Sequence, residues 1–296
     1  MSKYVPDIQS RRWVIIATGR RARPEDDFQH KKRNGVCVFC PGNEHITSEE
    51  VMRYGEGEKN EPGWKVRVIT NKFPITDYHE VIIHTPEDDK TLADVSQSQM
   101  ELVLQAYRDR YQFYKKNGQV LIFCNEGEHA GASIKHSHSQ LVVIPFQINL
   151  DALTQEPLNN IVQDNKFFHV YCPDFSQWPY EVWITPKEKG KVYGDITDEE
   201  REDLASIMQR ILKRLRTIHM KHPLSNSDFG YNYYIYPKEN WYIRIIPRFV
   251  HRAGFELGTG LNVNIVDPAD AAVALKGLDR KTESVLKKLN KRVRAK

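Results

Sequence analysis

Glu80-Val81-Ile82-Ile83-His84 recurs about one hundred residues later as Glu181-Val182-Trp183-Ile184-Thr185. Both are short apolar runs of the kind that form buried strands. Each is followed by a pattern with helical spacing of apolar residues, over 96–117 and over 197–218. The second helix opens with Thr-Asp-Glu-Glu, a capping box. The recurrence indicates that one structural unit is present twice.

Further strand patterns complete each copy in the same order. They are residues 65–69, 120–124 and 140–145 in the first copy, and 168–172, 231–236 and 242–247 in the second. Pro145 ends one copy and Pro247 the other. We expect an α+β fold: a duplicated unit with two mainly antiparallel sheets and helices packed on one side, divided into halves 1–150 and 151–296. Chance similarity between two α+β segments is the alternative.

The charge of the chain is unevenly distributed. The 296 residues carry a net charge of +4, and residues 279–296 alone carry +6, which leaves −2 on the rest. The excess positive charge therefore lies in the tail and not in the globular body. Because the body carries no net positive charge, we expect no nucleic-acid partner. No run of 18 apolar residues is present and the N-terminus lacks a signal-peptide core, so we expect no membrane partner and a cytoplasmic location.

The segment Asn-Glu-Gly-Glu-His-Ala-Gly-Ala-Ser-Ile-Lys-His-Ser-His-Ser-Gln, residues 125–140, carries the chemistry. In extended backbone His136, His138 and Gln140 point to one face. The Gly/Ser loop before them can offer backbone N–H groups to a phosphate. Imidazole is largely unprotonated at neutral pH, so it attacks phosphorus without a separate base. The pattern favours nucleotidyl transfer through a phospho-histidine, with metal ligands or polar surface residues as the alternative.

Five motifs, in order, resemble those of galactose-1-phosphate uridylyltransferases, a branch of the histidine-triad superfamily. They are the segment above and residues 37–44 (CVFCPGNE), 68–74 (VITNKFP), 79–83 (HEVII) and 253–260 (AGFELGTG). The resemblance covers most of the chain. It implies a duplicated histidine-triad-like fold and a nucleotidyltransferase of carbohydrate metabolism. It also implies a homodimer in which the N-terminal arm can serve the neighbouring active site.

The resemblance assigns roles to individual residues. His138 is the expected nucleophile, and His136 a zinc ligand. The expected phosphate contacts are Ser133, Gly131, Gln140 and Asn125. Asn71 and Phe73 are expected to line the nucleoside pocket with Val38 and Phe39, Arg20 and Arg23 to reach the active site, and Phe255 and Glu256 to face the sugar. A solvated basic patch is the alternative for the two arginines.

The metal site is expected to hold Zn²⁺ through Cys37, Cys40, His136 and Asp88. The two cysteines have zinc-knuckle spacing, and four cysteines without a signal peptide favour metal or redox chemistry over a disulfide. Asp88 stands where the family often has a histidine, and capping of a turn by Glu87 or Asp88 is its alternative role. His84 and His129 are interpreted as surface residues.

The second copy departs further from the family pattern. Asn240-Trp241-Tyr242 replaces a His-Trp-His, so no second metal is expected. We expect this half to be catalytically silent and to build the sugar pocket. The implied reaction moves UMP between UDP-hexose and hexose 1-phosphate by ping-pong chemistry. An adenylyl relative that uses phosphate as acceptor, such as an ADP-sugar phosphorylase, and a silent nucleotide-binding protein are the alternatives.

Overall fold

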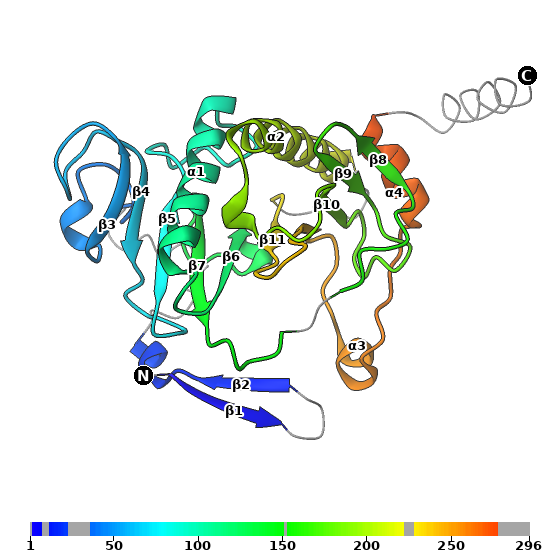
Figure 1. Cartoon of the computed structure of the whole chain (residues 1–296), viewed down its shortest axis with the longest axis horizontal. Coiled ribbons are helices and arrows are strands. Elements are labelled where there is room, and N and C mark those ends of the chain that lie inside the picture. The colour runs from blue at the N-terminus through cyan, green and yellow to red at the C-terminus, as the bar shows by residue number, and fades with distance from the viewer. Residues whose placement is uncertain (1, 8–11, 23–35, 151–152, 222–227, 278–296) are drawn as a thin grey trace, which may run out of the picture.

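The computed structural model describes residues 2–7, 12–22, 36–150, 153–221 and 228–277 (Figure 1). Arg23 and the basic tail lie outside this part of the chain. The first half contains β3 (Glu50–Gly55), β4 (Trp64–Thr70), β5 (His79–Ile83), α1 (Gln97–Tyr114), β6 (Gln119–Glu126) and β7 (His138–Ile144). The second contains β8 (Ile161–Asp164), β9 (Phe168–Tyr171), β10 (Val182–Pro186), α2 (Asp198–Lys221), β11 (Tyr231–Ile235) and β12 (Ile243–Pro247). The expected order of elements is confirmed.

All ten strands form one antiparallel sheet in the order β3-β4-β5-β7-β6-β11-β12-β10-β9-β8. The second half repeats the order of the first in reverse, so the α+β class and the duplication are both confirmed. The two expected sheets are joined, because β6 pairs with β11 from Ile122↔Ile235 to Glu126↔Tyr231. This pairing supplies hydrogen bonds to the backbone groups of two strand edges that would otherwise be exposed.

The long helices α1 and α2 contact each other and share one core with the strands of both halves (Figure 1). Ser96 caps α1 by accepting the Gln99 N–H at 3.1 Å. At α2 the predicted capping box is present, because Thr197 and Glu200 each accept the other's backbone N–H. The opposite face of the sheet is left for the strand side chains that carry the candidate chemistry.

Smaller elements complete the chain. β1 (Lys3–Asp7) and β2 (Arg12–Ile16) form a separate hairpin that the sequence patterns did not predict, and η1 (Thr18–Ala22) follows it. Other short turns are η2 (Glu44–Ile46), η3 (Glu128–Ala130) and η4 (Tyr193–Asp195), and the last helices are α3 (Gly254–Thr259) and α4 (Pro268–Lys276). No helix in the described ranges is long and apolar enough to cross a membrane.

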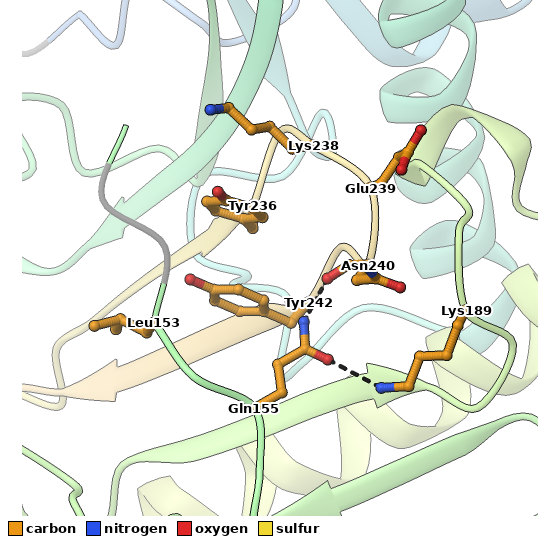
Figure 2. A pocket seen from close by; sticks show the side chains of 8 residues that line it. All are labelled: Leu153, Gln155, Lys189, Tyr236, Lys238, Glu239, Asn240 and Tyr242. Carbon is orange, nitrogen blue, oxygen red and sulfur yellow. Dashed lines mark hydrogen bonds between the residues drawn. The ribbon is translucent and has the colours of Figure 1, made fainter. Parts of the chain in front are cut away.

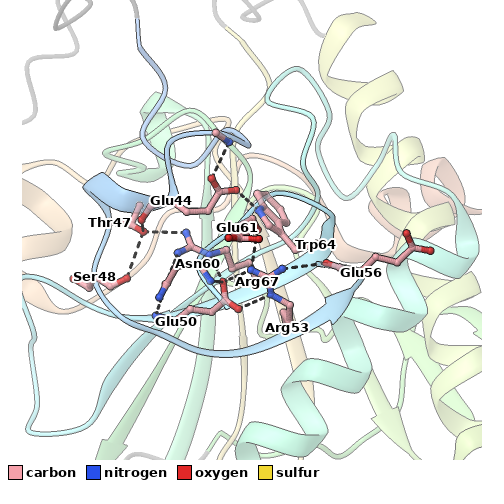
Figure 3. A network of polar contacts seen from close by, with 11 residues as sticks. Glu44, Thr47, Ser48, Glu50, Arg53, Glu56, Asn60, Glu61, Trp64 and Arg67 are labelled. Atoms are coloured by element: carbon pink, nitrogen blue, oxygen red, sulfur yellow. Dashed lines mark hydrogen bonds and ion pairs between the residues drawn. The ribbon is translucent and has the colours of Figure 1, made fainter. Parts of the chain in front are cut away.

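The sequence patterns did not predict β3, because its residues are held by ion pairs as well as by apolar packing (Figure 3). Glu50 on β3 accepts from Arg67 Nε on β4 at 2.6 Å and from Arg53 Nε at 2.5 Å. Arg67 is 1% exposed and also donates to Thr47 Oγ1 and Asn60 Oδ1. Two guanidinium groups on one buried carboxylate fix the edge of the sheet.

Replacing Glu50 by alanine is expected to lower the free energy of unfolding by about 3–5 kcal/mol. The substitution leaves the buried Arg67 charge with neutral acceptors only. Denaturant titration followed by circular dichroism measures the change. Glu49→Ala is the control, because its carboxylate pairs with Lys59 on the exposed surface and should matter little. Equal midpoints for Glu50→Ala and wild type would contradict the expectation.

Candidate active site

His138 is the first residue of β7 and is 7% exposed. Its Nδ1 lies 2.8 Å from the His136 carbonyl oxygen, which can only accept a hydrogen bond. Nδ1 therefore carries the proton of the neutral ring, and Nε2 keeps its lone pair. The Phe39 ring packs edge-on against this imidazole at 5.3 Å between centroids. The histidine is therefore fixed in the tautomer and orientation that a nucleophile needs.

His136 lies beside the two cysteines of the C-x-x-C. Its Nδ1 is 3.3 Å from Cys37 Sγ and 3.8 Å from Cys40 Sγ, and the three ligand atoms lie within 4.8 Å of one another. The other nitrogen, Nε2, donates to the Thr85 carbonyl at 2.6 Å, which turns the Nδ1 lone pair toward the sulfurs. Two thiolates and one imidazole are a donor set that fits zinc. The cluster can hold a metal.

Burial and hydrogen bonding oppose each other in this cluster. Burial tends to lower the pKa of His136, but the Cys37 sulfur and the Thr85 carbonyl outweigh it and raise that pKa above its ordinary value. Burial also tends to raise the pKa of Cys37, yet hydrogen bonds from His136 and Cys40 bring it below the ordinary value. A thiol whose pKa is lowered beside an imidazole is prepared to ligate a cation.

Asp88 lies near the cluster but outside the set of three close ligand atoms. Burial is the main reason that the pKa of Cys40 is raised to about 12, and the Asp88 carboxylate adds to the effect. Asp88 is therefore close enough to act on the Cys40 sulfur. Its role as fourth ligand stays a prediction.

The cysteine loop is attached to the sheet through Glu44, which is 4% exposed (Figure 3). Glu44 accepts the Trp64 indole N–H at 2.7 Å and the Gly42 backbone N–H at 2.8 Å. Asn43 donates to the Cys37 carbonyl at 2.9 Å. These contacts hold the loop in place before any metal binds.

Gln140 follows His138 on the same face of β7. Its Oε1 lies 2.9 Å from His79 Nε2 and 3.5 Å from Asn71 Nδ2. Asn71 Oδ1 accepts the Phe73 N–H at 2.8 Å, and the Phe73 carbonyl accepts from Arg20 Nη1 at 2.6 Å. The structure thus brings Gln140, Asn71, Phe73 and Arg20 together with His79, and their roles stay predictions.

The loop before β7 has an open backbone at Gly131 that a ligand could approach. Gly131 has φ +78° and an open position where a Cβ would stand, and Ser133 beside it is exposed. Asn125 on β6 accepts from Asn232 Nδ2 at 2.8 Å, and the same group donates to the Ala130 carbonyl at 2.8 Å. Asn232 was missed by the sequence reasoning. It comes from β11, so the second half supports the loop of the first.

Residues 75–146 match the family described as galactose-1-phosphate uridyl transferase, N-terminal domain. An ADP-glucose phosphorylase from Arabidopsis thaliana is 25% identical over 91% of each chain. A galactose-1-phosphate uridylyltransferase from Thermotoga maritima is 22% identical, over 89% of this chain and 94% of its own. In these comparisons the chain is similar to members of the galactose-1-phosphate uridylyltransferase family. These relatives are named as uridylyltransferases and as an ADP-glucose phosphorylase, names that are consistent with a nucleotidyltransferase.

The family fold extends over nearly the whole chain. The crystal structure of the Arabidopsis thaliana ADP-glucose phosphorylase with bound ADP-glucose matches with a TM-score of 0.69 and 23% identity, over 94% of this chain and all of that one. This likeness concerns the fold alone and agrees with the duplicated histidine-triad-like unit.

The two serines of the His-Ser-His-Ser-Gln segment point away from His138 and toward the buried His84. Ser137 donates to Glu126 Oε2 at 2.6 Å and lies 3.0 Å from His84 Nδ1. Ser139 lies 2.6 Å from His84 Nε2. Reading His84 as a surface residue was wrong, because it is 0% exposed and joins these serines. The alternation of β7 places histidines on one face and a buried polar network on the other.

The expected sugar-facing residues lie elsewhere. Phe255 is 55% exposed on α3, which stands apart from β7 (Figure 1). Glu256 accepts the Ala253 N–H at 3.0 Å and so caps its own helix. The structure does not bring these two residues to His138, and their roles in this galactose-1-phosphate uridylyltransferase relative stay predictions.

The second half has a pocket of about 790 Å³ beside the start of β12 (Figure 2). Asn240 there accepts the Gly190 N–H at 2.9 Å, and the Tyr242 ring is stacked between Trp183 at 4.5 Å and Tyr236 at 5.0 Å. The lining residues are Leu153, Gln155, Lys189, Tyr236, Lys238, Glu239, Asn240 and Tyr242. This set contains no histidine or cysteine. That the second half is catalytically silent stays a prediction.

Proposed function

We propose that the protein transfers a nucleotidyl group between a nucleoside diphosphate sugar and a sugar 1-phosphate or phosphate, through a covalent intermediate on His138. The observation that carries the proposal is the hydrogen bond from His138 Nδ1 to the His136 carbonyl, which leaves Nε2 as the nucleophilic atom. With UDP-hexose as donor and hexose 1-phosphate as acceptor, the reaction is the uridylyl transfer indicated by the sequence.

In the first step His138 Nε2 forms a bond to the α-phosphorus of the donor. The bond from that phosphorus to the bridging oxygen breaks, and sugar 1-phosphate leaves with the electron pair. In the second step an oxygen of the acceptor attacks the same phosphorus, and the P–N bond breaks to restore neutral imidazole. The ring becomes cationic when it is nucleotidylated, and the His136 carbonyl stabilises this cation through Nδ1–H.

We expect donors for the phosphate oxygens from three parts of the site. The exposed loop at Gly131 and Ser133 can supply backbone and hydroxyl donors, and Gln140 can supply its amide N–H groups. Arg20 adds a positive charge at the Phe73 turn. Preorganised donors of this kind stabilise the charge that develops on a transferring phosphoryl group.

The metal proposed for Cys37, Cys40 and His136 is zinc, with a positioning role. The same residue, His136, offers its ring to the metal cluster and its carbonyl to His138. A metal held by that ring would restrain the backbone that orients the nucleophile. The homodimer and the cytoplasmic location stay predictions.

An adenylyl donor is the second candidate. The relative named ADP-glucose phosphorylase aligns over 91% of both chains, and the structure of the Arabidopsis protein with ADP-glucose has the same fold. With phosphate as acceptor, the same two steps would release ADP in place of a nucleotide sugar.

Separate incubations with UDP-glucose and ADP-glucose, each labelled with ³²P at the α-phosphorus, test the proposal and select the donor. We expect acid-labile label on the protein from one of them, released by sugar 1-phosphate or by phosphate according to the acceptor. Absence of label from both donors would contradict the proposed function and favour a nucleotide-binding protein without turnover.

A further inference from the structure

His79 is a buried histidine that neither the metal cluster nor the nucleophile uses. It begins β5, is 4% exposed, and lies on the strand next to β7. Its ring reaches the side chain of Gln140, the residue proposed to contact the phosphate. A polar ring kept in a mostly apolar strand next to such a residue calls for a physical explanation.

The hydrogen bonds determine which nitrogen of His79 carries the proton. The Ile75 backbone N–H donates to Nδ1 at 2.9 Å, so Nδ1 is the acceptor of the neutral ring. Nε2 therefore carries the proton and donates to Gln140 Oε1 at 2.9 Å.

The Gln140 amide is oriented by the same contacts. Asn71 Oδ1 accepts the Phe73 N–H, so Asn71 Nδ2 is turned toward Gln140 Oε1, 3.5 Å away. Asn71 Nδ2 also lies 3.1 Å from His79 Nε2, so the two donor nitrogens stand side by side and face the same oxygen. The reversed amide would place its own NH₂ group against both donors, so this orientation is fixed by the surrounding side chains.

We propose that His79 is a positioning residue for nucleotidyl transfer, which holds the Gln140 amide so that its NH₂ group faces the transferring phosphate. The inference rests on the proposed function. In the described part of the chain, the NH₂ group of Gln140 donates to no protein acceptor, so it is available to a phosphate oxygen.

The turn that receives Arg20 holds His79 in place. The carbonyl of His79 accepts the Asn71 N–H at 2.8 Å, and its Nδ1 accepts the Ile75 N–H from the other end of that turn. Between these contacts lies Phe73, whose carbonyl accepts from Arg20. The turn thus fixes the His79 ring through Nδ1, and the ring acts on the phosphate through Gln140.

Single-turnover labelling of His138 tests the proposal with the donor that labels wild type. His79→Leu is expected to slow the labelling step about tenfold, and Gln140→Leu about a hundredfold, with little change in donor affinity. The double variant His79→Leu/Gln140→Leu should be no slower than Gln140→Leu, because His79 acts through that amide. His79→Gln, which keeps an N–H donor, should recover part of the rate. His169→Leu, on β9, is the matched control.

The outcomes separate the two proposals. If the wild-type protein acquires no label, the proposed function itself is contradicted. Wild-type labelling rates in His79→Leu would overturn the role of His79, and so would a further tenfold loss in the double variant, because independent effects multiply. Thermal melting of each variant shows whether a slower rate accompanies loss of the fold.

Discussion

His138→Ala is expected to remove covalent labelling completely and to lower nucleotidyl transfer by at least about 10⁴-fold, as loss of a catalytic nucleophile does in other covalent enzymes. The substitution removes the imidazole nitrogen Nε2, which is the proposed nucleophile. The Nδ1–H bond to the His136 carbonyl has no substitute in alanine.

The measurement is acid-labile label per chain together with the steady-state rate. His169→Ala is the control for loss of an imidazole, because His169 lies on β9 and pairs with Asp164. If His138→Ala still acquired label, the covalent bond would have to form on another residue. Metal content equal to wild type would show that the adjacent cluster is intact.

The fold was largely predictable from the sequence because its signals are local. The recurrence of the 80–84 pattern at 181–185 identified the duplication, and helical spacing identified α1 and α2. The joining of both halves into one sheet was not predictable, since it depends on the pairing of β6 with β11. Edge-to-edge pairing leaves no local pattern in either strand.

The candidate site was predictable where one motif carries it. His136, His138 and Gln140 are two residues apart, and the structure places them along one stretch. His79 and Asn232 were missed because their contacts span 61 and 107 residues. His84 was misread because a single histidine at a strand end has no pattern that distinguishes burial from exposure. Only the fold brings it between Ser137 and Ser139.

Removal of the metal is expected to affect stability and chemistry together. Cys37→Ser should abolish stoichiometric zinc and lower the free energy of unfolding by about 4 kcal/mol, the value for a metal present at a thousand times its dissociation constant. It should also slow labelling of His138 about 10–100-fold, because the His136 carbonyl that orients the nucleophile loses its anchor.

Metal analysis, thermal melting and single-turnover labelling measure the three effects, and a chelator added to wild type should reproduce them. Asp88→Asn separates the two roles left open for that carboxylate. If Asp88 is the fourth ligand, this substitution should weaken zinc binding about 10–100-fold, the range known for disturbed metal shells. If Asp88 only caps the turn, the substitution should leave the zinc affinity unchanged. Stoichiometric zinc in Cys37→Ser would contradict the ligand set, because the sulfur nearest to His136 Nδ1, at 3.3 Å, would then be dispensable.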